Sequence, residues 1–458
     1  MTDWTRRRFL SGAAGVAGAA AFGAPFLTLA QRAGAMSQNR DYGELYPCVD
    51  RTTDTVLLYL PKGFRCWSFG WTGDPLDDGT PIPDRHDGMA VVGEDRNELI
   101  LVRNHERRTT DGAFAPGAPN YDPMASGGTT TLHFDTKKKE MTRAYPSLTG
   151  TLTNCAGGPT PWGSWLTCEE TTAGPDTGGN VSEKHGYVFE VPGTGTASAV
   201  PLRDMGRLRH EACAVDPVRG DIYETEDVSL VGDPPLGGAG FYRFTPNQPG
   251  VLEQGGTLAM LAVTGEPGRG MDQAVTGDSF AVTWIPIPEP DPDPFTPSAV
   301  FDQGFDGGGA AFDRLEGCWT GDGVIYFIST NGGPGGRGQV FAYDIAAERL
   351  EVVFDSPHDG VAHGPDNITV SRGGGLLMCE DGGGSQFLQG LTLDGRPFRF
   401  GQNRVILDGE HGGFQGEFTT SEFAGACFSP NGKWLFVNVQ TPGISFAIKG
   451  PWKKGALA

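Results

Sequence analysis

Acidic residues recur at the ends of apolar segments in this sequence, and their spacing suggests a shared metal site. Three segments end in two carboxylic acids, and a fourth ends in Asn104-His105-Glu106. The three acidic steps are Glu169-Glu170, Glu226-Asp227 and Glu380-Asp381. Carboxylate oxygens are the ligands that calcium and magnesium prefer in proteins. A single step of this kind is usually solvated, but three at corresponding positions favour a common site.

A second set of polar residues begins the apolar segments that come just before those steps. Its members are Asn154-Cys155, His210-Glu211, Glu316, Asp366-Asn367 and Glu422. Carboxylates gathered this densely would repel one another and become protonated unless cations lay between them. A thiolate such as Cys155 would favour a softer metal, iron or zinc, although burial in the core explains this cysteine equally well. Arg314, two residues before Glu316, would form an ion pair or bind an anionic substrate.

These residues occupy matching places in a unit that repeats six times along the chain. In each unit an apolar strand leads into a turn rich in Gly, Asn, Asp or Pro, and a second apolar strand follows. The units span 89–106, 154–170, 210–227, 316–331, 366–381 and 422–440. Most are followed by a third strand in which aromatic residues alternate, as at 186–191, 240–244 and 338–344. The pattern predicts an all-β chain.

Six equivalent units predict a six-bladed β-propeller, in which the innermost strands line a central channel. A β-sandwich would explain the strands but not their six-fold repetition. We expect residues 36–458 to form this single domain, with an acidic, proline-rich insertion near 286–297. The innermost strands would then bring the polar residues together on the propeller axis.

The composition narrows the possible functions. The chain contains 71 Gly and 34 Pro, which favour turns, and its net charge of −21 leaves no basic surface for nucleic acid. An acidic surface is also explained by solubility alone. The eight cysteines are spread along the chain without tight spacing, which predicts buried free thiols rather than a disulfide framework.

Residues 1–35 carry the pattern of a twin-arginine export signal. Arg6, Arg7 and Arg8 precede Phe9-Leu10 and an apolar run rich in Ala and Gly. Small residues at 33–35 offer a cleavage site, and an N-terminal membrane anchor is the alternative. We expect the twin-arginine translocon to export the folded chain to the periplasm or the medium, with no stable membrane span in the mature form.

Several stretches together resemble the PhoX-type alkaline phosphatases. They are 104–106, 154–170, 210–217, 226–227, 314–319, 365–370, 379–381, 422–425 and 428–438. The resemblance implies a monomeric exported propeller with a mixed Fe³⁺ and Ca²⁺ cluster that hydrolyses phosphate monoesters. It implies that Cys155 is a thiolate ligand of iron and that Glu211 and Glu316 are carboxylate ligands. Further ligand candidates from the same resemblance are Glu170, Glu226, Asp227, Asp366, Glu380 and Asp381. Arg314 resembles a phosphate-binding residue, which Asn154 or Asn104 could assist.

Three functions are compatible with these features. The first is metal-dependent hydrolysis of small phosphorylated substrates at the axis of the propeller. The second is a calcium-dependent lactonase or phosphodiesterase, which would need fewer ligands and no cysteine. The third is a non-catalytic binding propeller in which calcium is only a structural plug. Iron beside calcium, together with activity on a phosphate monoester, would separate the first from the others.

Overall fold

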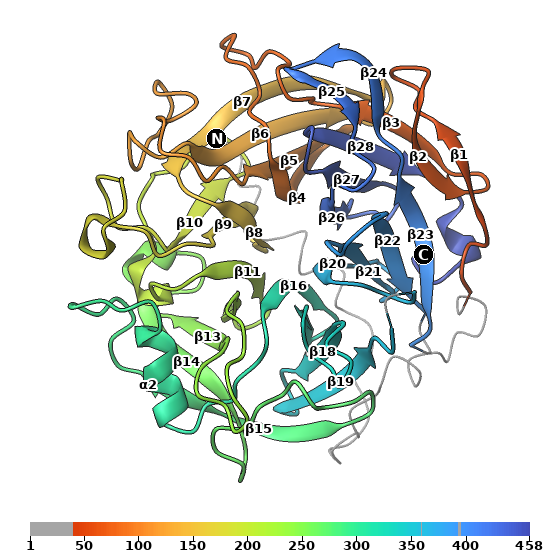
Figure 1. Cartoon of the computed structure of the whole chain (residues 1–458). Helices are drawn as coiled ribbons and strands as arrows, with labels where there is room; N and C mark the ends of the chain where they lie inside the picture. The colour runs from red at the N-terminus through yellow and green to blue at the C-terminus, as the bar shows by residue number, and fades with distance from the viewer. Residues whose placement is uncertain (1–39, 359, 393–394) are drawn as a thin grey trace.

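The computed structural model describes residues 40–358, 360–392 and 395–458. The predicted export signal at 1–35 therefore lies outside the described residues. Within those residues the chain is built almost entirely of strands, with one α-helix, α2 (Ala299–Asp306), and short 3-10 turns. Figure 1 shows the sheets arranged radially around a central axis. The prediction of an all-β propeller is confirmed.

The strands form antiparallel meanders that follow the chain around the axis (Figure 1). The first two sheets contain β4 (His86–Asp95), β5 (Glu98–His105), β6 (Gly127–Asp135) and β7 (Glu140–Thr151), then β8 (Asn154–Pro159), β9 (Ser164–Glu169) and β10 (Val188–Pro192). Next come β11 (His210–Val215), β12 (Ile222–Glu226), β13 (Phe241–Pro246) and β14 (Gly256–Val263). The strand β15 (Ser279–Ile287) joins these to β16 (Leu315–Gly321), β17 (Val324–Ser329), β18 (Gln339–Asp344) and β19 (Arg349–Asp355). The stretch near 286–297 leads from β15 to α2.

The remaining sheets combine strands from both ends of the chain. One contains β20 (Pro365–Val370), β21 (Leu376–Glu380), β22 (Phe387–Leu391) and β23 (Pro397–Asn403), extended by β2 (Val56–Pro61) and β1 (Leu45–Val49). Another contains β26 (Phe423–Phe428), β27 (Leu435–Val439), β28 (Ile444–Lys449) and β3 (Arg65–Phe69). A separate hairpin contains β24 (Ile406–His411) and β25 (Phe414–Glu417). Pairing of N-terminal with C-terminal strands closes the ring.

Strands β4, β8, β11, β16, β20 and β26 are the innermost strands of their meanders (Figure 1). Each contacts the next in this order, and β26 contacts β4, so that among the described residues the six strands form a closed ring. Each also starts one of the repeat units found in the sequence. For this reason, equivalent repeat positions lie at equivalent places around the axis.

Local sequence explains why the hairpins form where they do. Strands β16 and β17 are joined by Asp322 and Gly323, whose φ angles are +49° and +79°. Two consecutive residues with positive φ make the tight turn whose twist matches that of antiparallel strands, and Asp-Gly is a favoured pair for it. Apolar side chains on the flanking strands are buried, including Val324, Ile325 and Phe327.

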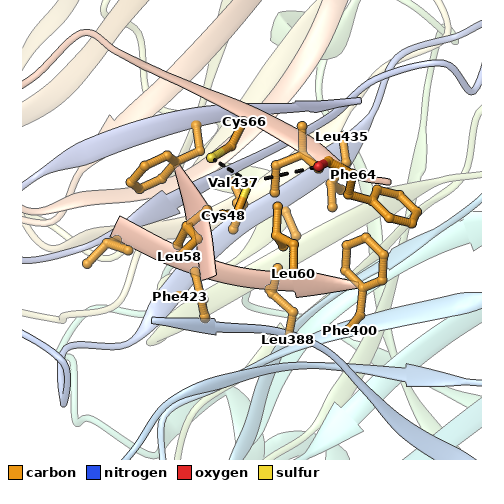
Figure 2. Packing of buried hydrophobic residues seen from close by; sticks show 14 of the residues in the cluster. Cys48, Leu58, Leu60, Phe64, Cys66, Leu388, Phe400, Phe423, Leu435 and Val437 are labelled. Atoms are coloured by element: carbon orange, nitrogen blue, oxygen red, sulfur yellow. Dashed lines mark hydrogen bonds between the residues drawn. The ribbon is translucent and has the colours of Figure 1, made fainter. Parts of the chain in front are cut away.

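The hydrophobic core lies between neighbouring sheets. Figure 2 shows the layer between the two sheets that contain N-terminal strands, where Leu58 and Leu60 of β2 pack with Leu388, Phe423 and Val437. Burial of such side chains contributes about 1.5–3 kcal/mol each. No helix in the described part of the chain is long and apolar enough to cross a bilayer.

Candidate metal centre

A β-bulge interrupts every inner strand near its start, after the first paired residue in five strands and after the second in β26. The register with the hairpin partner shifts between His86/Met89, Asn154/Gly157, His210/Cys213, Leu315/Cys318, Pro365/Ile368 and Ala424/Cys427. A bulge adds an unpaired residue and turns its side chain away from the regular alternation of the strand. In five of the six strands, the first residue of the bulge lines a common cavity. These residues are Asp87, Cys155, Glu211, Glu316 and Asp366.

Small residues directly after the bulged residues let the inner strands approach one another closely. A Cβ atom on Gly88 would lie 2.6 Å from the Cα of Ala156, and one on Gly317 would lie 2.7 Å from the Cα of Asn367. Only a residue without a Cβ fits such an approach. The narrow part of the channel therefore lies just beneath the acidic cavity.

The cavity at the mouth of the axis has a volume of about 380 Å³. Nine carboxylates, one thiol and three guanidinium groups line it, with Ser229 and Gln440. The acidic residues are Asp87, Glu106, Glu170, Glu211, Asp227, Glu316, Asp366, Asp381 and Glu422. The arginines are Arg108, Arg209 and Arg314. Three positive side chains cannot compensate this many carboxylates, so further cations are needed if all are to be ionised.

Three groups of side chains bring their ligand atoms within 4.8 Å of one another. They are Cys155 with Glu170 and Glu211, Glu211 with Glu316 and Asp366, and Asp366 with Asp381 and Glu422. Glu211 belongs to the first two groups and Asp366 to the last two. The groups therefore form one continuous row of candidate ligands across the cavity rather than isolated sites.

The pKa values of these carboxyl groups are raised, because the groups are buried close together without cations between them. Burial raises the pKa of Asp366 to about 8, and repulsion from Asp381 adds to the shift. Burial and then repulsion from Asp227 raise the pKa of Glu170 to about 7. Burial also raises the pKa of Glu211 and of Glu316 well above the ordinary range. A cation in the cavity would remove these shifts because it stabilises the ionised form.

The donor atoms fit metal ions of two kinds. The row contains oxygen donors only, except for the sulfur of Cys155. Burial and the neighbouring Glu211 raise the pKa of the Cys155 thiol, so this side chain stays neutral unless a metal binds it. A group with one sulfur and two carboxylates suits iron or zinc, whereas the all-oxygen groups suit calcium or magnesium.

Arg314 is held at the cavity mouth by its backbone and by two carboxylates. Its φ angle is +53°, a left-handed conformation that costs about 1–2 kcal/mol for a residue with a side chain. Nε and Nη2 donate to the two carboxylate oxygens of Asp227 at 2.8 Å each, and Nη2 also donates to Glu316 at 2.6 Å. The guanidinium is therefore fixed in orientation while its side chain stays 36% exposed.

Two further arginines line the cavity, Arg108 and Arg209. Nη2 of Arg209 donates to Glu170 at 2.8 Å, and Nε of Arg108 donates to Glu106 at 2.9 Å. Both side chains remain largely exposed. Arg209 immediately precedes β11, as Arg314 precedes β16, so the repeat could have revealed it. Arg108 lies in the loop after β5, where the repeat gives no signal.

The two members of each acidic pair at the end of a second strand have different roles. The second member of each pair, Glu170, Asp227 or Asp381, lines the cavity. The first member points into its own sheet and forms a side-chain hydrogen bond there. Glu169 bonds to His185 at 2.6 Å, Glu226 to Tyr242 at 2.7 Å, and Glu380 to Gln389 at 3.0 Å. Glu226 and Glu380 were predicted as metal ligands, but the structure does not bring them to the cavity. Alternation along a strand explains the division.

The two predicted phosphate-binding amides also lie away from the cavity. Asn104 donates to the carbonyls of Cys155 and Ala156 and accepts from Trp165 and Thr167. Asn154 accepts from Thr151 and donates to Thr167. Both are fully buried, and their observed contacts hold the bulged strand β8 in place. A direct role of either amide in binding phosphate stays a prediction.

The cavity is lined by seven of the predicted ligands and by Arg314. It is also lined by residues that the prediction did not name as ligands. These are Asp87, Glu106, Glu422, Arg108 and Arg209. Glu106 and Glu422 had been placed at equivalent repeat positions but not assigned to a metal. Asp87 lies outside the predicted unit 89–106, because β4 begins at His86, three residues before that unit. The His86-Asp87 step matches His210-Glu211 and could have revealed it.

Comparisons with known proteins show the family to which the chain belongs. The sequence profile of the family Alkaline phosphatase PhoX matches residues 42–143 and 131–443. No functionally curated protein matches the sequence. Among solved structures, Pseudomonas fluorescens PhoX in complex with vanadate, a transition state analogue, is 18% identical, covers 91% of this chain and 99% of its own, and has a TM-score of 0.65. A gluconolactonase from Xanthomonas campestris is 14% identical, covers 90% and 99%, and has a TM-score of 0.43. The chain belongs to the PhoX alkaline phosphatase family.

Proposed function

We propose that this protein hydrolyses phosphate monoesters in the axial cavity, with Fe³⁺ and Ca²⁺ held by the cavity residues. The observation that carries the proposal is the continuous row of candidate ligands from Cys155 to Glu422, with Arg314 fixed beside its centre. Membership of a phosphatase family supports the reaction type. A lactonase would have no evident use for a thiol in this row.

The donor atoms suggest how the metal ions are distributed. Cys155, Glu170 and Glu211 would hold iron, because a thiolate favours it over calcium. The two all-oxygen groups, which share Asp366, would hold calcium. When bound, the ions would polarise the phosphoryl oxygens and neutralise the charge that develops during hydrolysis.

Arg314 supplies the main contribution of the chain itself to phosphate binding. Its bonds to Asp227 and Glu316 use Nε and Nη2, and within the described residues Nη1 has no such bond. The two N–H groups of Nη1 are therefore available to the oxygens of a phosphoryl group, in the geometry that favours arginine over lysine. Arg209 and Arg108 offset the negative charge that a dianionic substrate meets on entering the cavity.

The other parts of the proposal concern the protein in the cell. The twin-arginine segment supports export of the folded chain to the periplasm or the medium, where small phosphorylated substrates are encountered. Interaction with the twin-arginine translocon during export, and a monomeric mature form, belong to the same proposal. Export in the folded state suits a protein that acquires iron before it leaves the cytoplasm.

Hydrolysis of p-nitrophenyl phosphate tests the reaction. We expect activity that a calcium chelator abolishes and that added calcium restores, and weaker activity on bis(p-nitrophenyl) phosphate. Vanadate is bound in Pseudomonas fluorescens PhoX, so it should also inhibit this protein competitively. A protein that carries its metals but cleaves neither ester would rule out the proposal, and a preference for the diester would replace it with a phosphodiesterase.

A further inference from the structure

Two pairs of cysteine thiols lie in contact, although all eight cysteines are reduced in the structure. The side chains of Cys48 and Cys66 point toward each other (Figure 2), and their Sγ atoms are 3.3 Å apart. The Sγ atoms of Cys168 and Cys213 are also 3.3 Å apart. A disulfide needs about 2.05 Å between the sulfur atoms, so each pair is roughly an ångström from bonding distance. The two pairs differ in where they lie.

Cys48 lies at the periphery of the molecule. It belongs to β1, the last strand in its sheet, which hydrogen-bonds only to β2 in the sheet order (Figure 1). Its neighbour Val49 is 50% exposed, and Cys48 itself is 9% exposed. Because β1 is the outermost strand of its sheet, local opening of this one strand is enough to let a reagent reach the thiol.

The second pair is enclosed by the core. Cys168 lies on β9, the central strand of its sheet, and Cys213 lies on the inner strand β11. Both side chains are completely buried among apolar residues. The two pairs have the same separation of sulfur atoms but differ in how easily a reagent reaches them. The second pair is therefore an internal control for the first.

The chemistry of the two pairs also differs. A hydrogen bond from the Cys66 thiol lowers the pKa of Cys48, because it stabilises the Cys48 thiolate. The same bond raises the pKa of Cys66. In the second pair, burial raises the pKa values of both Cys168 and Cys213, so neither member has a lowered pKa. The thiolate is the form that attacks a disulfide, so Cys48 combines access with reactivity.

We propose that Cys48 and Cys66 are a site of oxidative modification, which forms a disulfide when the folded chain meets a disulfide-bearing oxidant, while Cys168 and Cys213 stay reduced. The Cys48 thiolate attacks one sulfur of the oxidant and releases the other as a thiol. The Cys66 thiol then loses its proton and attacks the sulfur of Cys48, and the second sulfur of the oxidant leaves as a thiol. The pair loses two electrons and two protons, and the oxidant gains them.

The bond would link two sheets of the propeller. Cys48 belongs to the sheet of β20–β23, and Cys66 lies on β3 in the sheet of β26–β28. The backbone already connects these points, because the N–H of Arg51 donates to the carbonyl of Cys66 at 3.1 Å. A disulfide here restrains the unfolded chain and keeps the edge strand β1 docked. It would therefore stabilise the closure of the ring without touching the metal cavity.

A peptide map of the oxidised full-length protein tests the proposal. The purified, metal-loaded chain is incubated with oxidised glutathione, denatured, alkylated and digested with trypsin. The sequence places Cys48 in a peptide 41–51 and Cys66 in a peptide 66–85, so a bond between them is seen as one linked species. We expect this species, six alkylated cysteines, and a Tm that is roughly 3–6 °C above that of the reduced protein. The Tm rise should be absent in Cys66→Ala and retained in Cys213→Ala.

The map on the wild-type chain is decisive even if an alanine variant does not fold. Eight alkylated cysteines after oxidation would overturn the proposal. Oxidation of Cys168 and Cys213 as fast as Cys48 and Cys66 would overturn it too, because accessibility would then not select the pair. Phosphatase activity plays no part in these readouts, so the result is independent of the proposed reaction.

Discussion

Arg314 and Asp227 form a two-point ion pair, with Nε–Oδ1 and Nη2–Oδ2 distances of 2.8 Å each. Asp227 directly follows β12, the second strand of one meander, and Arg314 immediately precedes β16, the inner strand of the next. The pair therefore fixes the guanidinium between two successive meanders. Its remaining nitrogen, Nη1, is left for a ligand in the cavity.

We predict that Arg314→Lys lowers kcat/KM for p-nitrophenyl phosphate by about 100-fold. Lysine keeps the positive charge but cannot bind Asp227 and a phosphoryl group with one planar fork. Steady-state kinetics measure the effect, and elemental analysis should find the same metal content as in the wild type. Arg219→Lys, at an exposed turn away from the cavity, serves as the control. Unchanged kcat/KM in the Arg314 variant would refute the role given to this side chain.

The acidic pair at the end of β21 provides a second test, since its two members point in opposite directions. Asp381→Asn should raise the calcium concentration needed for half-maximal activity by about 10-fold or more, because it removes a charged candidate ligand. Glu380→Gln should leave that concentration unchanged, since glutamine still accepts hydrogen bonds from Gln389 and the backbone of His363. A calcium titration of activity compares the two. Equal effects would contradict the division of roles within the pair.

The raised pKa values predict how pH affects the metal-free protein. The pKa of Asp366 rises from an ordinary value of 3.8 to about 8 in the folded state, because of burial and repulsion from Asp381. The folded protein then binds more protons than the unfolded chain between about pH 4 and 8. Its stability in chelator should fall as pH rises through this window.

Thermal unfolding at pH 5.5 and pH 8.5 measures this effect. We expect the Tm in chelator to drop by on the order of 5 °C at the higher pH, and added calcium to raise it more there than at pH 5.5. Asp366→Asn should flatten the profile in chelator. A Tm that rises with pH in the chelated wild type would show that the cavity carboxylates do not dominate the pH dependence.

The repeat was predictable because each hairpin follows local rules of alternation and turn chemistry. All six predicted units coincide with an inner strand and its hairpin partner, for example the unit 366–381 with β20 and β21. The third strands were predictable from their aromatic alternation, as in β18. The pairing of β3 with β28 was not, because it joins residues almost 400 positions apart and leaves no local signal.

The orientation of individual acids was harder to predict. A shift of one residue in strand phase reverses which member of a pair faces the axis, and the sequence of Glu226-Asp227 is compatible with either. The bulges add to the difficulty, because they place Glu211 and Glu316 at the cavity by breaking regular alternation. Asn104 and Asn154 have the chemistry to bind phosphate, but their hydrogen-bonding groups are engaged by the sheet around β8.

Elemental analysis of wild-type protein beside Cys155→Ala tests the central claim most directly, with phosphatase activity measured on the same samples. Cys427→Ala, which removes a buried thiol from the inner strand β26 outside the cavity, controls for loss of packing. We predict iron and calcium in the wild type and in the control, and loss of iron together with activity in Cys155→Ala. Iron retained in Cys155→Ala, or a wild type that is active without iron, would contradict a thiolate-bound iron at the axis.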